Sequence, residues 1–362
     1  MMNEKRMKKA FGLWLTVLLL FCMLTGCAQP AAVKPSQTVQ TVPSQTVQVL
    51  PSQGAQEEPL VSAYFIDVGQ GDCILLCSAG QTMLIDAGTN QTGANALSYL
   101  QALGLKTLDI VVGTHPHEDH IGGLDTVINA MESVGKVYMP KVTANTKTYE
   151  DVLTAIAAKG LKITVPKAGT SFAFGNCTVE ILAPVRIYES STNDNSIVLR
   201  VIAGDISMLF TGDAEIQSER DILASGAAVK SDLLKLGHHG SSTSTGEEFF
   251  EAVSPSVAVI MCGKDNSYGH PHEETLQKLQ NTELWRTDLQ GTIVAQSDGK
   301  SLKLSAAVQL PQQEAAYIGN KKSNVFHLPS CASLPAEANR AYFSDRQQAV
   351  DAGMKPCGLC KP

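Results

Sequence analysis

Residues 113–123 read GTHPHEDHIGG and hold three histidines and an aspartate within six positions. His115 and His117 are separated by one residue, so in an extended segment both side chains leave the same side and can bind one cation. Asp119 and His120 follow where a helix is expected to begin, offset enough to bind a second cation. Neutral imidazoles with a carboxylate suit zinc, iron or manganese. The spacing predicts a metal centre, against the alternative of ordinary core and surface histidines.

Several apolar runs typical of strands end in polar residues of the same ligating kinds. LDIVVGTH leads into the histidine segment, ISMLFTGD ends at Asp213, and DLLKLGHHGS ends at His238 and His239. Segments with helical spacing, such as NALSYLQALG and YEDVLTAIAAKG, stand between such runs. Open sheets place active sites at the carboxyl ends of their strands. We therefore expect an α/β fold whose strands bring these residues to one edge.

These motifs, in this order, resemble the metallo-β-lactamase-fold hydrolases from about Val61 to Leu304, with the H-x-H-x-D-H motif intact. The resemblance implies a four-layer αββα sandwich with two divalent metal ions, zinc or manganese. It implies that Asp213 bridges the metals and that Asp86, in LIDAG, holds a ligand histidine. The implied metal ligands are His115, His117, Asp119, His120, Asp213 and His239.

A narrower resemblance is carried by FIDVGQGDCILL, NDNSIVLRV, LLKLGHHGSSTST and NSYGHPH. Together with the histidine segment they resemble the extracellular domain of the bacterial competence DNA-uptake channel and its stand-alone relatives. No histidine stands between His120 and His238, so the wider family's third ligand to the first metal is absent, and Asn195 is expected to contribute an oxygen or hold a water. Five further motif residues are expected to line the site: Asp67, Gln70, Asp72, Ser196 and Asn266. The loop that carries Asp67, Gln70 and Asp72 also fits a bare hairpin turn.

Two cations about 3.5–4 Å apart lower the pKa of a bridging water toward roughly 7. Similarity to related phosphodiesterases implies that His239 binds metal and His238 faces the substrate, with the reverse left open. Asp119 is expected to orient the water as well as bind metal. His238 or His270 is expected to stabilise an oxyanion or protonate the leaving group, and the alternative for His270 is a turn histidine before Pro271.

The first 58 residues read as an export signal and a tether. A basic start and a short apolar run over residues 1–26 are typical of a secretory signal. LTGC resembles the lipobox of bacterial lipoproteins, which implies lipidation of Cys27; the alternative is an uncleaved anchor with an incidental cysteine. Residues 27–58 repeat PSQTVQ-like units without core spacing, so we expect a disordered tether. The net charge of −7 counts mildly against a polyanionic substrate, whose binding would need a local basic patch or bound metal cations.

The hydrolase domain is expected over residues 59–310, and residues 311–362 carry a Cys/His set of their own. The four residues with zinc-site spacing are His327, Cys331, Cys357 and Cys360. The segment resembles the metal-binding domain of the Ada DNA-repair protein, where all four ligands are cysteines. A histidine in first place removes one thiolate and argues against methyl-acceptor chemistry, so we expect one structural zinc. The alternative is a disulfide of Cys357 with Cys360 or Cys331.

The leading hypothesis is a membrane-tethered, extracytoplasmic, dinuclear metal-dependent phosphodiesterase or nuclease that acts on DNA, with DNA-uptake machinery as a partner. The residues alone support metal-assisted hydrolysis, and the narrower resemblance adds DNA. One alternative is hydrolysis of choline-phosphate or cell-wall polymer esters, which would call for an aromatic cage that the motifs do not show. Another is a non-catalytic DNA-capture lipoprotein, which would have no need to keep every metal ligand.

Overall fold

The computed structural model describes residues 58–307, 317–336, 339–343 and 346–362. The expected export signal, the tether and Cys27 lie outside the described residues, and so does the boundary expected at residue 311. Among the described residues, no helix has both the length and the apolar character needed to span a membrane.

The larger domain contains an eight-stranded sheet. From one edge to the other its strands are β15 (Leu302–Ala306), β14 (Ile293–Ser297), β1 (Val61–Phe65), β2 (Ile74–Ser78), β3 (Gln81–Ile85), β4 (Thr107–Val112), β5 (Ser133–Tyr138) and β6 (Ile163–Thr164). The strands from β3 to β6 are parallel, so their carboxyl ends lie at the same edge.

A seven-stranded sheet faces the first. Its strands are β13 (Glu283–Arg286), β12 (Val257–Ile260), β11 (Leu233–Lys235), β10 (Ile206–Phe210), β9 (Val198–Ala203), β8 (Cys177–Ala183) and β7 (Thr170–Phe174). The strands from β10 to β13 are parallel. Each sheet therefore has a parallel half that delivers the residues after its strands to one edge.

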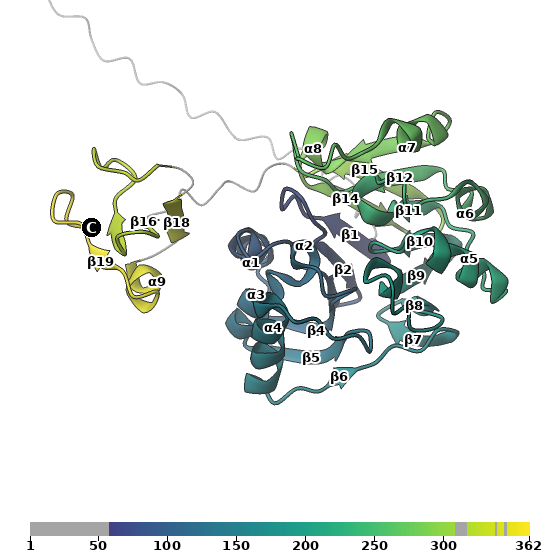
Figure 1. Ribbon diagram of the computed structural model, residues 1–362, viewed down its shortest axis with the longest axis horizontal. Coiled ribbons are helices and arrows are strands. Elements are labelled where there is room, and N and C mark those ends of the chain that lie inside the picture. The colour runs from purple at the N-terminus through teal and green to yellow at the C-terminus, as the bar shows by residue number, and fades with distance from the viewer. Residues whose placement is uncertain (1–57, 308–316, 337–338, 344–345) are drawn as a thin grey trace, which may run out of the picture. The chain divides into compact units, whose positions relative to one another are not determined.

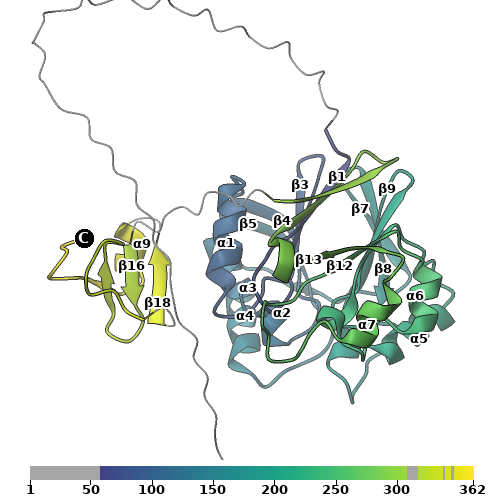
Figure 2. The same cartoon turned by 90° about the horizontal axis from the view of Figure 1, so that it is seen from above.

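Helices cover the outer face of each sheet (Figures 1 and 2). On the first sheet lie α1 (Gly93–Ala102), α3 (Leu124–Ala130) and α4 (Lys147–Ala158), and on the second lie α5 (Ile216–Ala224), α6 (Glu247–Val253) and α7 (Glu273–Lys278). Shorter helical turns lie in the connections: α2 (Glu118–Ile121), η1 (Asn193–Asn195), η2 (Gly237–Gly240) and α8 (Thr287–Gln290). The layers confirm the predicted αββα sandwich.

The main core lies between the two sheets. Phe65 on β1 stacks against Phe210 on β10, with ring centroids 6.0 Å apart. Along β2, Ile74 and Leu76 face this core while Leu75 faces the helices. This two-residue alternation buries both faces of the strand, which explains why its sequence is apolar throughout.

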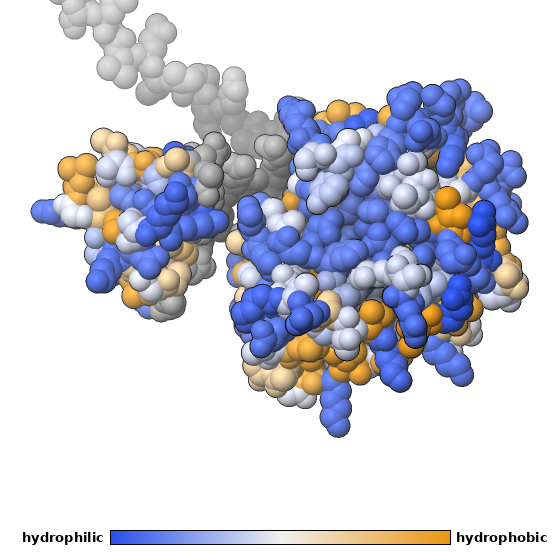
Figure 3. All heavy atoms as spheres, viewed as in Figure 1, coloured by the Kyte–Doolittle hydropathy of each residue, from blue (hydrophilic) through white to orange (hydrophobic). Residues whose placement is uncertain are grey.

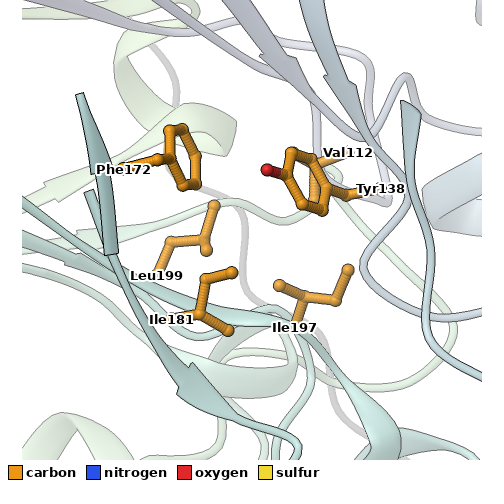
Figure 4. Close-up of a pocket in the computed structure, with 6 residues that line it drawn as sticks. All are labelled: Val112, Tyr138, Phe172, Ile181, Ile197 and Leu199. Carbon is orange, nitrogen blue, oxygen red and sulfur yellow. The ribbon is translucent and has the colours of Figure 1, made fainter. Parts of the chain in front are cut away.

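Between the two sheets a small apolar gap remains (Figure 4). It leaves no room for a water molecule and is lined by Val112, Tyr138, Phe172, Ile181, Ile197 and Leu199. The Tyr138 and Phe172 rings stack across it with centroids 5.5 Å apart. We interpret the gap as a packing feature of the core.

The C-terminal segment forms a four-stranded sheet of its own. Its strands are β18 (Arg340–Phe343), β16 (Tyr317–Asn320), β17 (Val325–His327) and β19 (Lys355–Pro356), and α9 (Arg346–Asp351) precedes β19. Phe326 is fully buried and Ile318 is nearly so. So few buried side chains indicate that this fold needs support beyond its apolar core.

Candidate metal centre

The H-x-H-x-D-H residues lie in the turn that joins β4 to α2. His115 is buried, and its Nε2 lies 3.0 Å from Nδ1 of His117. The two rings therefore present nitrogens to one point, as their spacing predicts. Asp119 and His120 follow in the first turn of α2, with His120 fully buried.

The loop after β3 fixes the orientation of His120. Asp86 Oδ2 lies 2.8 Å from His120 Nδ1 and also accepts a hydrogen bond of 2.6 Å from the Thr114 hydroxyl. The loop comes this close because Gly123 has no side chain: a Cβ there would lie 2.3 Å from the Ala87 carbonyl oxygen. With the proton held on Nδ1, His120 Nε2 is free to bind a cation. This is the contact that we expected of Asp86.

Asp213, in the turn after β10, brings the second sheet into the site. Its Oδ2 lies 3.1 Å from His120 Nε2, 3.5 Å from His239 Nε2 and 3.9 Å from His115 Nε2. Burial alone would raise the pKa of Asp213, but the charges of His120 and His239 outweigh it and hold this pKa well below its usual range. Asp213 is thus a carboxylate in the position of a shared ligand.

The turn Gly237–Gly240 places two histidines with opposite exposures. His239 is buried, and its Nδ1 lies 2.9 Å from the Met261 carbonyl oxygen, which leaves Nε2 3.2 Å from Asp119 Oδ2. Both histidines have positive φ, 49° for His238 and 55° for His239. Non-glycine residues adopt this conformation at a cost, and it is often found at functional sites.

His238 lies on the open side of the same turn. Its side chain is 24% exposed, and its Nε2 is 3.8 Å from Asp213 Oδ2. Its Nδ1 lies 3.1 Å from the Thr243 hydroxyl and 3.3 Å from Glu215 Oε1. Burial lowers the pKa of His238, with a smaller opposing effect of Asp213. Of the two histidines, His239 is thus the one buried beside Asp119 and Asp213, and His238 is the one that reaches solvent.

The donor atoms fit a metal centre. Buried His120 Nε2, His239 Nε2 and Asp213 Oδ1 have no hydrogen-bond partner, and buried polar atoms without partners are uncommon and call for an explanation. Two groups of donors each lie within 4.8 Å of one another: His115, His120 and Asp213, and Asp119, His120 and His239. Imidazole nitrogens with carboxylate oxygens suit zinc or manganese. Cations bound there would satisfy all three atoms.

Polar side chains surround the metal centre on the surface of the protein. Figure 3 shows hydrophilic residues gathered over the middle of the face that Figure 1 presents, around α2. His117 is exposed, while His115 and His120 lie below it. The centre is therefore open to solvent on the side of His117 and His238.

Asn195 does not contribute an oxygen to the site. Its Oδ1 accepts from Tyr188 N at 3.0 Å, and its Nδ2 donates to the carbonyls of Tyr188 and Ser191 at 2.8 and 2.6 Å. This corrects the expectation for Asn195, because its amide is used to hold the loop before it. The neighbouring Ser196 faces the site instead, with its Oγ 3.2 Å from His115 Nδ1.

The loop over residues 67–72 lies against the histidine segment. A Cβ on Gly71 would lie 2.2 Å from the Asp119 carbonyl oxygen, so only glycine permits this approach. Gln70 Oε1 accepts from Gly263 N at 3.1 Å and ties the loop to the segment after β12. Asp67 accepts from Gly69 N at 2.9 Å and thereby shapes the turn. The loop therefore lines the site rather than forming an isolated hairpin.

Lys235 is a residue of the site that the sequence reading overlooked. It is fully buried at the end of β11, contacts the Asp72 carboxylate and donates to the Gly212 carbonyl at 3.2 Å. Asp72 Oδ1 lies 3.4 Å from His239 Nδ1. Burial alone would raise the pKa of Asp72, but the charge of Lys235 and further contacts with His239 lower it. A lysine inside the apolar run DLLKL was the available signal.

His270 lies beside the two histidines of the GHHG turn. Its ring centroid is 5.5 Å from that of His238 and 6.2 Å from that of His239. Its Nδ1 is buried without a hydrogen-bond partner. Burial, followed by the charges of His239 and His238, lowers the pKa of His270 to about 4. Asn266 accepts from His270 N at 3.0 Å and thus holds the turn that carries it.

The four C-terminal residues His327, Cys331, Cys357 and Cys360 come together, with ligand atoms within 4.8 Å of one another. Cys360 Sγ accepts from Leu328 N at 3.3 Å, and the three cysteines form no disulfide. One imidazole and three thiols fit a closed tetrahedral zinc site. The cluster is the zinc-binding site predicted from the spacing.

Comparison with known families gives two matches. The sequence model described as "Metallo-beta-lactamase superfamily" matches residues 66–264. That described as "Metal binding domain of Ada" matches residues 307–362. The first match covers the His/Asp metal centre, and the second covers the His/Cys cluster of the C-terminal segment.

Among curated proteins, the chain is 34% identical to "ComE operon protein 3" of Bacillus subtilis, over 63% of this chain and 32% of that protein. It is 31% identical to "Recombination protein 2" of Haemophilus influenzae, over 59% and 26% of the two chains, and 32% identical to "Competence protein ComA" of Neisseria gonorrhoeae, over 63% and 31%. The chain thus spans about a third of the length of these relatives. A solved structure, the metallo-beta-lactamase fold protein YhfI from Bacillus subtilis, aligns with a TM-score of 0.46 at 14% identity, over 68% of this chain and 100% of that chain.

Proposed function

The chain belongs to the metallo-beta-lactamase superfamily, and on that premise we propose that it is an exported, lipid-anchored, metal-dependent phosphodiesterase that hydrolyses DNA. The observation that carries the proposal is the set of buried nitrogen and oxygen atoms without partners around Asp213. A non-catalytic DNA-capture protein would not need such a set.

The residues around the centre have separable roles in this reaction. Two divalent cations, zinc or manganese, would supply a nucleophilic water and neutralise charge on the substrate. They would be held by His115, His117, Asp119, His120, Asp213 and His239. The side chain of Asp119 is partly exposed, and we assign it to orienting that water as well as to binding metal.

Two further histidines serve the substrate. His238 is half-open to solvent and held at Nδ1 by Thr243, so its Nε2 is the atom presented to a substrate oxygen. The pKa of His270, lowered to about 4, makes its ring a neutral hydrogen-bonding group at neutral pH. We assign His238 to the stabilisation of developing negative charge and His270 to the leaving-group side.

DNA as the substrate is supported by two of the relatives, which are named "Recombination protein 2" and "Competence protein ComA". More distant relatives are named endoribonucleases. A protein with a net charge of −7 repels a polyanion on average. Metal cations bound at the centre would supply local positive charge for such a substrate, which fits a phosphodiester as the reacting group.

The decisive test is cleavage by the purified protein after it has been stripped of metal and reloaded with manganese or zinc. We expect cleavage of DNA that requires metal and is lost in Asp119→Ala, while the exposed surface variant Glu132→Ala remains active. Full metal loading with intact DNA but cleavage of bis-(p-nitrophenyl) phosphate would reject DNA and keep a phosphodiesterase. Retention of DNA without any cleavage would favour the capture protein.

The membrane anchor is tested separately. Replacing the acceptor thiol in Cys27→Ser should move the protein from the membrane fraction to the soluble extracytoplasmic fraction. The matched variant Cys22→Ser, within the apolar run, should leave it in the membrane fraction. Equal membrane retention of both variants, together with a wild-type N-terminus whose mass shows residues 1–26 still present, would reject lipidation and favour an uncleaved anchor.

A further inference from the structure

An exposed aromatic ring lies next to the metal centre and has no role in the reaction described above. Tyr268 is 64% exposed and is the aromatic side chain among the large apolar residues that lie open to solvent in the described part of the chain. Its ring stacks on that of His270, with centroids 5.7 Å apart and planes 20° from parallel. Because one face rests on His270 and most of the side chain is still exposed, the opposite face is open to solvent.

The turn that carries Tyr268 is held without any ligand. The Asn266 side chain accepts from the backbone N–H groups of Tyr268 and His270 at 3.2 and 3.0 Å. It also donates to the carbonyls of Gly263 and His270 at 2.9 and 2.6 Å. One amide thus closes the whole turn, so the ring is pre-organised and binding need not pay for ordering it.

The same turn is tied to the metal-binding turn. His272 N donates to the Gly240 carbonyl at 3.0 Å, and His272 Nδ1 lies 3.0 Å from Ser242 N. His270 stands between the two turns, with ring centroids 5.7 Å from Tyr268 and 6.2 Å from the ligand His239. One ring, that of His270, therefore separates the Tyr268 ring from the ligand His239, which places Tyr268 beside the metal centre and not within it.

We propose that Tyr268 is a stacking platform for an unpaired nucleobase of the nucleotide next to the scissile phosphodiester. The inference rests on the proposed function and deepens it, because it makes single-stranded DNA the substrate class. A base within a duplex has both faces covered by its neighbours, whereas an unpaired base can lay one face on an aromatic ring. Every base has such a face, so this platform selects strandedness and not sequence.

The test compares wild type with Tyr268→Phe, Tyr268→Leu and Tyr268→Ala on a single-stranded oligonucleotide, the same strand in a duplex, and an abasic strand of equal length. Phe keeps the flat face, while Leu keeps apolar bulk without one. We expect Phe to keep the KM for the base-bearing strand within about twofold, and Leu and Ala to raise it about tenfold, the effect of losing one base–aromatic stack. Wild type should prefer the single strand to the duplex.

The effects of removing the ring and removing the base should not multiply, because both remove the same contact. The inference is overturned if Tyr268→Ala raises the KM of the abasic strand as much as that of the base-bearing strand, or if Leu behaves like Phe. If wild type cleaves no strand, the proposed function has failed, and the same proteins are compared by their Kd for the fluorescently labelled strands. A Kd that does not depend on the ring at position 268 then overturns the inference as well.

Discussion

Lys235 and Asp72 form a buried ion pair that joins the two sheets at the metal centre. Lys235 ends β11 of the second sheet, and Asp72 belongs to the loop between β1 and β2 of the first. Lys235 also donates to Gly212, directly before Asp213, and Asp72 lies against His239. The pair therefore helps to set the positions of ligands that come from opposite sheets.

Replacing the lysine should destabilise the protein and weaken its metal site. Lys235→Met keeps the length of the side chain but leaves the Asp72 carboxylate buried without its partner, which costs about 3–5 kcal/mol of unfolding free energy. We expect this loss in chemical denaturation, together with weaker metal binding in a chelator competition. Lys106→Met, whose side chain is 75% exposed, should change stability by less than about 0.5 kcal/mol. Equal effects of the two substitutions would show that the buried pair has no special role.

Asp86→Asn should weaken metal binding although it changes only one atom. The two carboxylate oxygens accept three hydrogen bonds, from Thr114 N, the Thr114 hydroxyl and His120 Nδ1. An amide must turn its NH₂ group toward one of these donors, so either the turn or the His120 tautomer is disturbed. Loss of such a partner lowers metal affinity about 10–100-fold. Metal competition and the Co²⁺ absorption spectrum measure this, with Asp205→Asn in the exposed turn between β9 and β10 as the control. An unchanged affinity would contradict the role assigned to Asp86.

Glu219 should make stability depend on pH. Burial raises the pKa of this carboxyl from 4.5 to about 7, so the folded protein holds a proton that the unfolded chain releases. The contribution of Glu219 to the free energy of unfolding is therefore complete below pH 4.5 and is lost as the pH rises through 7. The free energy of unfolding should fall by about 2 kcal/mol between pH 5 and pH 8 for this reason. Glu219→Gln should remove that part of the pH dependence of the unfolding free energy, whereas the exposed Glu150→Gln should retain it. Parallel pH curves for wild type and Glu219→Gln would refute this assignment.

The fold and most of the ligands could be predicted because their signals are local. The apolar composition of strands such as β10 predicts them directly. The parallel strands of both sheets end at one edge, and His115, Asp213 and His239 follow there. The ligand residues stand directly after those strands. Strand order and exact contacts were not needed to expect them together.

The missed features depend on contacts between distant segments. Asn195 belongs to a motif near the ligands, but its amide forms hydrogen bonds with the backbone of Tyr188 and Ser191. Sequence spacing does not predict this side-chain direction. Lys235 is meaningful only once Asp72, which is 163 positions away, lies beside it. Tyr268 becomes a platform only when Asn266 closes its turn. Side-chain direction inside loops is therefore where sequence reasoning fails.

The C-terminal cluster should hold one zinc ion that its domain needs in order to fold. The described segment buries few apolar side chains, whereas structural zinc supplies on the order of 10 kcal/mol in small domains. Cys331→Ser should remove one zinc per chain and make residues 317–362 sensitive to protease, while the larger domain stays resistant. Cys77→Ser, on β2 and outside the cluster, should keep the zinc content. If the cysteines instead formed a disulfide, chelation would release no titratable thiols, whereas a zinc site frees three from Cys331, Cys357 and Cys360.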